Sequence, residues 1–140
     1  MIMYIFWGKV RKHNQRGKKL GFPTANVNLT KNISEGIYVS QAKITNSVYP
    51  ALTFIGTAKT FNEKSFHAEV YILNFNEQVL SFGNKDIYGK WLSVKLLKKI
   101  RDNKKFNSAT ELIAQMKKDE VVARKYLGYY KRVGTRHNED

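Results

Sequence analysis

The sequence contains no cysteine among its 140 residues. This absence excludes disulfides, thiolate metal sites and a cysteine nucleophile. No apolar run approaches the roughly 20 residues that a membrane-spanning helix needs, and residues 1–7 lack the basic start and small-residue cleavage site of a signal peptide. Without these two signals we expect a cytoplasmic protein. A chain of this length suits a single hydrophobic core, so we also expect one domain.

Acidic residues are scarce: 11 Asp and Glu stand against 25 Lys and Arg, which gives a formal net charge of +14. Such an excess favours polyanionic partners, and nucleic acid is therefore an alternative to be weighed. The basic residues are spread over the first loop, residues 95–105 and residues 117–136, and no known nucleic-acid motif is present. We expect any binding to nucleic acid to be non-specific.

Aromatic and β-branched residues between turn signals predict a series of strands. The predicted strands are 4–10, 25–29, 36–44, 47–56, 66–75 and 90–100, with 77–82 as a further short strand or loop. Thr45 and Asn46 indicate a hairpin between the third and fourth strands, and Pro50 suggests an edge or a bulge. Consecutive strands without intervening helices favour an antiparallel barrel over a parallel sheet.

A change of period after Phe106 predicts one helix near the end of the chain. Ser108 followed by Glu111 forms a capping box. Apolar residues then recur at helical spacing, namely Leu112, Ile113, Met116, Val122, Ala123, Tyr126 and Leu127. We therefore expect a helix over about 108–127 that ends near Gly128 and packs on the barrel, within a domain spanning 1–128. Residues 129–140 are expected to form a mobile polar tail.

A basic, glycine-punctuated loop over residues 16–22 has the composition of a phosphate-binding loop. Gly17 and Gly21 allow tight turns and a close approach of the backbone to a ligand. Arg16, Lys18 and Lys19 supply positive charge beside them. The loop therefore suits an anionic ligand such as a nucleotide phosphate.

Pro23, Thr24 and Asn26 follow this loop directly. If the chain is extended after Pro23, Thr24 and Asn26 point to the same face, because side chains alternate along a strand. A hydroxyl and an amide oxygen are hard ligands that suit Mg²⁺ shared with substrate phosphates. The alternative is an ordinary turn in which both side chains bond local backbone.

The order and spacing of these motifs resemble the riboflavin kinase (flavokinase) family from about residue 4 to about residue 124. The matching positions are Gly8, Val10, Arg16, Gly17, residues 20–26, Glu69, Asp86, Tyr88, Gly89, Ile100, Arg101 and Phe106. The sequence departs from the family pattern at His13, Lys18 and Lys59, where Gly, Arg and Pro are usual. These departures concern the loop conformation and the affinity for the nucleotide.

The resemblance implies a six-stranded antiparallel Greek-key β-barrel with a C-terminal α-helix. It also implies Mg²⁺-dependent transfer of the ATP γ-phosphate to the 5′-hydroxyl of riboflavin, giving FMN and ADP, by a protein that we expect to be a monomer. In the common bacterial arrangement this domain follows a nucleotidyltransferase domain that makes FAD, and the sequence shows nothing of that domain. We therefore expect a chain that stops at FMN, or a fragment of a bifunctional enzyme.

The same resemblance implies roles for individual residues. Glu69 matches the proposed catalytic base, and Thr24 and Asn26 match the metal ligands. The segment 86–89 would close over flavin and nucleotide, and the segment 101–106 would form a flap near the isoalloxazine ring, where the Arg101 fork suits phosphate oxygens. The cofactor-binding positions implied are Gly8, Val10, Arg16, Gly17, Lys18, Gly21, Pro23, Thr24, Asn26, Asp86, Tyr88, Arg101 and Phe106.

Local sequence alone favours plainer interpretations of several of these residues. A Glu in a strand, such as Glu69, is most often solvated, and Asp86 with Gly89 is typical of a turn. Arg101 would be a solvated cation and Phe106 a core aromatic. Two other protein classes also stay open: a small basic barrel that binds single-stranded nucleic acid by stacking, and a flavin-binding module without catalysis.

Overall fold

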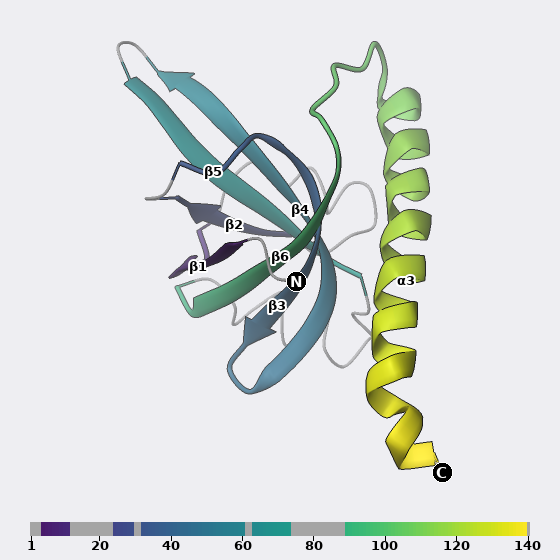
Figure 1. Cartoon of the computed structure of the whole chain (residues 1–140). Coiled ribbons are helices and arrows are strands. Elements are labelled where there is room, and N and C mark those ends of the chain that lie inside the picture. The colour runs from purple at the N-terminus through teal and green to yellow at the C-terminus, as the bar shows by residue number, and fades with distance from the viewer. Residues whose placement is uncertain (1–3, 12–23, 30–31, 61–62, 74–88, 140) are drawn as a thin grey trace.

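Six strands and one helix are seen in the computed structural model, which describes residues 4–11, 24–29, 32–60, 63–73 and 89–139. The strands are β1 (Tyr4–Lys9), β2 (Thr24–Asn28), β3 (Gly36–Ile44), β4 (Ser47–Thr60), β5 (Glu63–Ile72) and β6 (Trp91–Arg101). The helix is α3 (Ala109–Glu139). In Figure 1 this helix runs along the outside of the strands.

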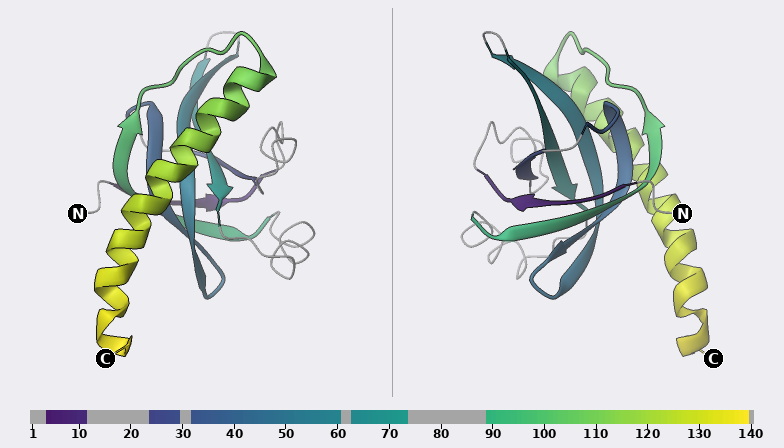
Figure 2. Two further views of the ribbon diagram at one scale, coloured as in Figure 1. Left: turned by 90° about the vertical axis from the view of Figure 1, so that its right-hand side faces the viewer. Right: turned by 60° about the vertical axis from the view of Figure 1, so that its left-hand side comes forward.

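The strands form one antiparallel sheet that curls into a nearly closed barrel. Their order is β1-β6-β3-β4-β5-β2, so β1 and β2 are the two outer strands. An isolated bridge connects the end of β1 to β2, because the Arg11 amide donates to the Asn26 carbonyl at 2.7 Å. The two views of Figure 2 show the strands around a common interior with α3 outside it. The predicted six-stranded antiparallel barrel with a C-terminal helix is confirmed.

Two apolar layers hold this architecture together, and β5 contributes to both. Val70 and Ile72 belong to the cluster inside the barrel, where they are at most 1% exposed. Tyr71 and Leu73 belong to a second cluster, which also contains Met116 of α3 and therefore lies between barrel and helix. Because side chains alternate along a strand, Glu69 shares the outer face of β5 with Tyr71.

The predicted strands agree with the observed ones to within one residue at most bounds, and differ at the hairpin between β4 and β5 and at the end of β5. The fifth strand was predicted over 66–75, whereas β5 begins at Glu63 and ends at Ile72. The prediction ended the fourth strand at residue 56, whereas β4 continues to Thr60 and pairs there with Glu63. Lys59, which stands where the family usually has Pro, therefore lies within a strand.

Pro50 was expected at an edge or bulge, but β4 is an inner strand and Pro50 pairs in register with Gln41 of β3. The pairing of β4 with β5 begins after it, at Ala51. The short strand or loop predicted at 77–82 lies outside the described residues.

Helix α3 begins as the sequence predicts but ends much later. The Ser108 hydroxyl accepts a hydrogen bond from the Glu111 amide at 3.2 Å, and the Glu111 carboxylate accepts one from the Asn107 amide at 3.0 Å. The predicted end near Gly128 is wrong, because the helix continues to Glu139 through most of the expected tail. One glycine without a following proline weakens a helix but does not stop it. None of the described helical residues forms a segment long and apolar enough to cross a membrane.

Two glycines should respond to alanine substitution in opposite directions. A Cβ at the buried Gly8 of β1 would collide with the Val27 side chain of β2, whereas a Cβ at the exposed Gly128 of α3 would meet no atom within 4 Å. We expect Gly8→Ala to lower the stability by about 1–3 kcal/mol through overpacking. Gly128→Ala should raise it by up to about 1 kcal/mol through helix propensity. Thermal unfolding of both variants checks this, and an unchanged melting temperature for Gly8→Ala would contradict the observed packing.

Candidate functional site

A cavity of about 790 Å³ opens between the outer face of the barrel and the start of α3. Its walls come from β4, β5, the segment 101–108 that leads from β6 to α3, and the first turn of the helix. The lining residues that matter for chemistry are Phe54, His67, Glu69, Tyr71, Arg101, Lys104, Lys105 and Phe106. The cavity thus combines aromatic walls, one buried carboxylate and several cations.

Glu69 is the buried carboxylate of this cavity, with 4% of its surface exposed. The Tyr71 hydroxyl donates to Glu69 Oε2 at 2.6 Å, and His67 Nε2 lies 3.8 Å from Glu69 Oε1. These three side chains sit at alternate positions on the outer face of β5. The solvated glutamate that local sequence favours is therefore wrong. A carboxylate oriented in this way can accept a proton from a hydroxyl group bound in the cavity.

Asn26 lies beside Glu69, because β2 and β5 pair with these two residues in register. Asn26 is 5% exposed, and the backbone of Thr24 pairs two residues away with Tyr71. The expected extended conformation of 24–28 is confirmed, so the ordinary-turn alternative is wrong. The Asn26 amide and the Glu69 carboxylate, on adjacent strands, are hard oxygen donors that fit Mg²⁺. The part of the Thr24 hydroxyl in holding the ion stays a prediction. Among the described residues, no group of three His, Asp or Glu side chains forms a metal site by itself.

The Arg101 fork, which the resemblance implies lies near phosphate, is paired with a carboxylate of α3. Its Nε donates to both carboxylate oxygens of Asp119 at 2.8 and 3.0 Å, and its Nη2 donates to Asp119 Oδ2 at 2.6 Å. Its Nη1 donates to the Asp102 carbonyl at 3.1 Å. The fork is therefore engaged within the protein. The solvated cation favoured by local sequence is wrong, since only 17% of the Arg101 side chain is exposed. The binding of phosphate by Arg101 stays a prediction.

The segment 101–108 is held over the cavity by several contacts. The Asn103 side-chain amide donates to the Ile55 carbonyl at 3.1 Å. Phe106 is half-buried and lines the cavity, with the Arg101 guanidinium carbon 6.0 Å from its ring centre. Phe54 lies on the β4 side of the same cavity, and its ring meets that of Tyr71 edge to face at 5.2 Å. Flat aromatic rings thus line the cavity on two sides.

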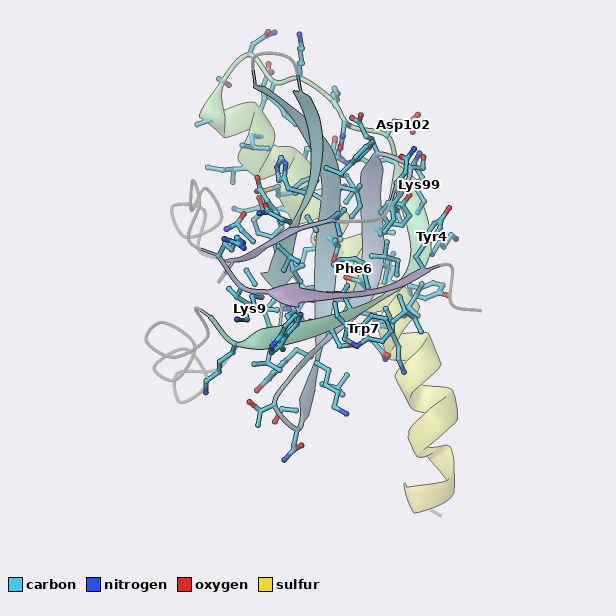
Figure 3. The ribbon with its side chains drawn as sticks, turned by 90° about the vertical axis from the view of Figure 1, so that its left-hand side faces the viewer. Tyr4, Phe6, Trp7, Lys9, Lys99 and Asp102 are labelled. Atoms are coloured by element: carbon cyan, nitrogen blue, oxygen red, sulfur yellow. The ribbon has the colours of Figure 1, made fainter. Side chains whose placement is uncertain are left out.

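An ion pair between Lys99 and Asp102 lies where β6 leads into this segment, with 2.8 Å between Nζ and Oδ1 (Figure 3). The hydrogen bond between the two side chains raises the pKa of Lys99 and lowers the pKa of Asp102. The Asp102 contribution is present above the pKa of an unfolded aspartate and is lost as pH falls through its folded value. Because both groups are accessible to solvent, this pair adds little to stability.

Gly8 and Val10, which the resemblance implies as cofactor-binding positions, contribute to the packing and hydrogen bonding of the barrel in this structure. Both are buried, and neither lines the cavity. The Val10 amide donates to the Lys90 carbonyl, and the Val10 carbonyl accepts from the Gly89 amide, each at 2.9 Å. Their part in cofactor binding stays a prediction. The remaining predicted positions lie outside the described residues, namely Arg16, Gly17, Lys18, Gly21, Pro23, Asp86 and Tyr88, as does His13.

Sequence reasoning missed two residues that shape this site. Tyr71 was assigned only to a strand face, yet its hydroxyl orients Glu69. Asp119 was not considered, although it is 3% exposed and pairs with Arg101. A signal for Asp119 exists in the sequence, because it lies three residues after Met116 and four before Ala123, on the buried stripe of the helix. A carboxylate at such a position predicts a buried cationic partner.

Comparison with known proteins gives matches over most of the chain. The family model described as riboflavin kinase matches residues 2–127. A bifunctional riboflavin kinase/FMN adenylyltransferase of Bacillus subtilis is 34% identical over 89% of this chain and 39% of its own. A trifunctional protein, RibF/MnmA, of Mycoplasmoides gallisepticum is 39% identical over 83% of this chain and 17% of its own. The chain therefore spans well under half the length of these relatives.

Solved structures share the fold. A protein from Streptococcus pneumoniae described as a macrolide-efflux protein is 36% identical, with a TM-score of 0.73 over 86% of this chain and 38% of that one. Riboflavin kinase from Trypanosoma brucei has a TM-score of 0.63 over 94% of this chain and 81% of that one, and at 24% identity it supports the fold alone. Since the family model covers nearly the whole chain, this protein belongs to the riboflavin kinase family.

Proposed function

We propose that this protein transfers the γ-phosphoryl group of ATP to the 5′-hydroxyl of riboflavin. The bond between the γ-phosphorus and the oxygen that bridges the β- and γ-phosphates breaks, and a bond between the γ-phosphorus and the ribityl oxygen forms. The hydroxyl proton passes to Glu69. The products are FMN and ADP. The observation that carries this proposal is a buried, oriented Glu69 in an aromatic-walled cavity, directly beside Asn26 on the neighbouring strand.

The cavity suits riboflavin because its walls match a flat ring. Phe54 and Phe106 offer aromatic faces and edges, which favour stacked or edge-to-face packing against the isoalloxazine. A ring held there leaves the ribityl chain to extend along β5, where Glu69 can accept a hydrogen bond from its terminal hydroxyl. Glu69 then orients the attacking oxygen and takes its proton, a contribution typically of about 10²–10⁴-fold.

Phosphoryl transfer otherwise requires positioning and neutralisation of charge. Asn26, with Thr24 two residues before it, would hold Mg²⁺ beside Glu69. When bound, the ion neutralises charge on the transferred phosphoryl group. Lys104 and Lys105 line the cavity and are exposed, so they can attract the anionic substrate and hold the new phosphate. The monomeric state and the cytoplasmic location stay predictions from the sequence.

Incubation with riboflavin and MgATP, followed by chromatographic detection of FMN, tests this function. FMN formation supports the kinase. Riboflavin binding without turnover would instead indicate a flavin-binding module, and tight oligonucleotide binding without either would indicate a nucleic-acid-binding barrel.

A further inference from the structure

Asp119 is an unusual residue of α3 because its carboxylate is buried, with 3% of the residue exposed. It faces the barrel on the same stripe as Met116 and Ala123, which pack in the apolar layer under the helix. An ionised carboxylate in such a place is costly unless it is paired and hydrogen-bonded. Its partners should therefore explain why the helix carries it.

Arg101 at the end of β6 supplies the main partner. Nε and Nη2 of Arg101 engage Asp119 in a fork with distances of 2.6–3.0 Å. The Gln115 side-chain amide, one turn earlier on the helix, adds a hydrogen bond to Asp119 Oδ1 at 3.1 Å. Bidentate contacts of this kind fix the plane and the rotation of the guanidinium group.

The guanidinium that Asp119 fixes is in contact with the aromatic walls of the cavity. Its carbon lies 5.8 Å from the ring centre of Phe54 and 6.0 Å from that of Phe106. Phe54 belongs to β4, whereas Phe106 belongs to the segment that leads into α3. The Arg101 guanidinium group is therefore within cation–π distance of both aromatic walls.

We propose that Asp119 is a positioning residue for the ring-binding part of the cavity: through Arg101 it holds the two aromatic walls at the separation that a flat substrate ring needs. This inference rests on the proposed function, because it takes riboflavin as the occupant. Asp119 lies outside the cavity lining, so it acts on binding of the ring and leaves the phosphoryl-transfer groups at Glu69 and Asn26 in place.

Asp119→Asn tests this role, since it keeps the side-chain shape and removes the charge. We expect the KM and the Kd for riboflavin to rise about 10-fold, within the range of coupling between contacting groups, while kcat and the KM for MgATP change less than about 3-fold. Glu120→Gln is the matched control, because it breaks the neighbouring Arg124–Glu120 ion pair of 2.7 Å, which is far more exposed. The control should behave as the unmodified protein does.

A second variant separates positioning from folding, because loss of one partner of a buried ion pair destabilises proteins. The double substitution Arg101→Met with Asp119→Leu replaces the pair by apolar groups and should restore the melting temperature. We expect riboflavin binding, measured by quenching of flavin fluorescence, to stay weakened in this stable variant. Wild-type affinity for riboflavin in both variants would overturn the positioning role of Asp119 and would leave the proposed function standing. Absence of FMN formation and of riboflavin binding in the unmodified protein would overturn the proposed function as well.

Discussion

Glu69→Gln is expected to lower kcat for FMN formation by about 10²-fold or more, with the Kd for riboflavin little changed. The amide keeps the shape of the side chain and can still accept the hydrogen bond that the Tyr71 hydroxyl donates at 2.6 Å. It cannot take the proton of the ribityl hydroxyl. The loss should therefore fall on the chemical step, which steady-state kinetics and a separate measurement of riboflavin affinity resolve.

Glu120→Gln serves as a control for this substitution as well, since it removes a carboxylate on α3 outside the cavity lining. Its kcat should match that of the unmodified protein. If Glu69→Gln makes FMN at close to the parent rate, Glu69 is not the base, and the hydroxyl loses its proton late without a dedicated acceptor. A large loss of riboflavin affinity instead would assign Glu69 to binding.

Asn26→Ala and Thr24→Ala should each reduce FMN formation by about 10²-fold, because loss of an oxygen ligand weakens a charge stabilisation worth several kcal/mol. Higher Mg²⁺ concentrations should restore part of the activity by mass action, and the apparent Mg²⁺ requirement should rise. The barrel should stay folded, since neither substitution removes an apolar residue of its core. Kinetics over a range of Mg²⁺ concentrations measure both effects.

Asn28→Ala is the matched control for these variants. Asn28 is the same residue type on the same face of β2 as Asn26, but it is exposed and pairs with His67 rather than with Glu69. Its activity and Mg²⁺ dependence should be unchanged. MgATP affinity and FMN formation at parent levels in Asn26→Ala and Thr24→Ala would contradict the proposed metal site.

The strands were predictable because most of them carry their signals locally. Residues 36–44 were predicted at the observed bounds of β3, since the strand is bounded by Gly36 and by the turn at Thr45. Thr45 has a φ of 57°, which fits a tight turn. The end of β4 was missed because its extension to Thr60 is stabilised by pairing with β5, which short-range patterns do not reveal.

The helix shows the same division between local and long-range information. The capping residues Ser108 and Glu111 predicted its start correctly. Val122 was predicted on the buried stripe and is 46% exposed, while Asp119 is buried by its ion pair with Arg101. Arg101, which is 18 positions away in the chain, stabilises the buried position of Asp119, and the local pattern of the helix does not contain this information.

The site was predictable only through the family resemblance. Glu69 and Asn26 lie far apart in the chain on two separate strands and meet only through the register of β2 with β5. Strand alternation alone placed Thr24 and Asn26 on one face of their strand, and Glu69 with Tyr71 on one face of another. It could not bring these faces together, because the pairing of β2 with β5 depends on the folding of the whole barrel.

Transfer of label from ATP that is radiolabelled at the γ-phosphate tests the central claim most directly. The purified protein is incubated with riboflavin, labelled ATP and Mg²⁺, and the flavins are separated from nucleotide and free phosphate. The account predicts labelled FMN formed in equal amount with ADP, and its near-complete loss in Glu69→Gln. Release of label only as free phosphate, or unreacted ATP in the presence of bound riboflavin, would contradict it.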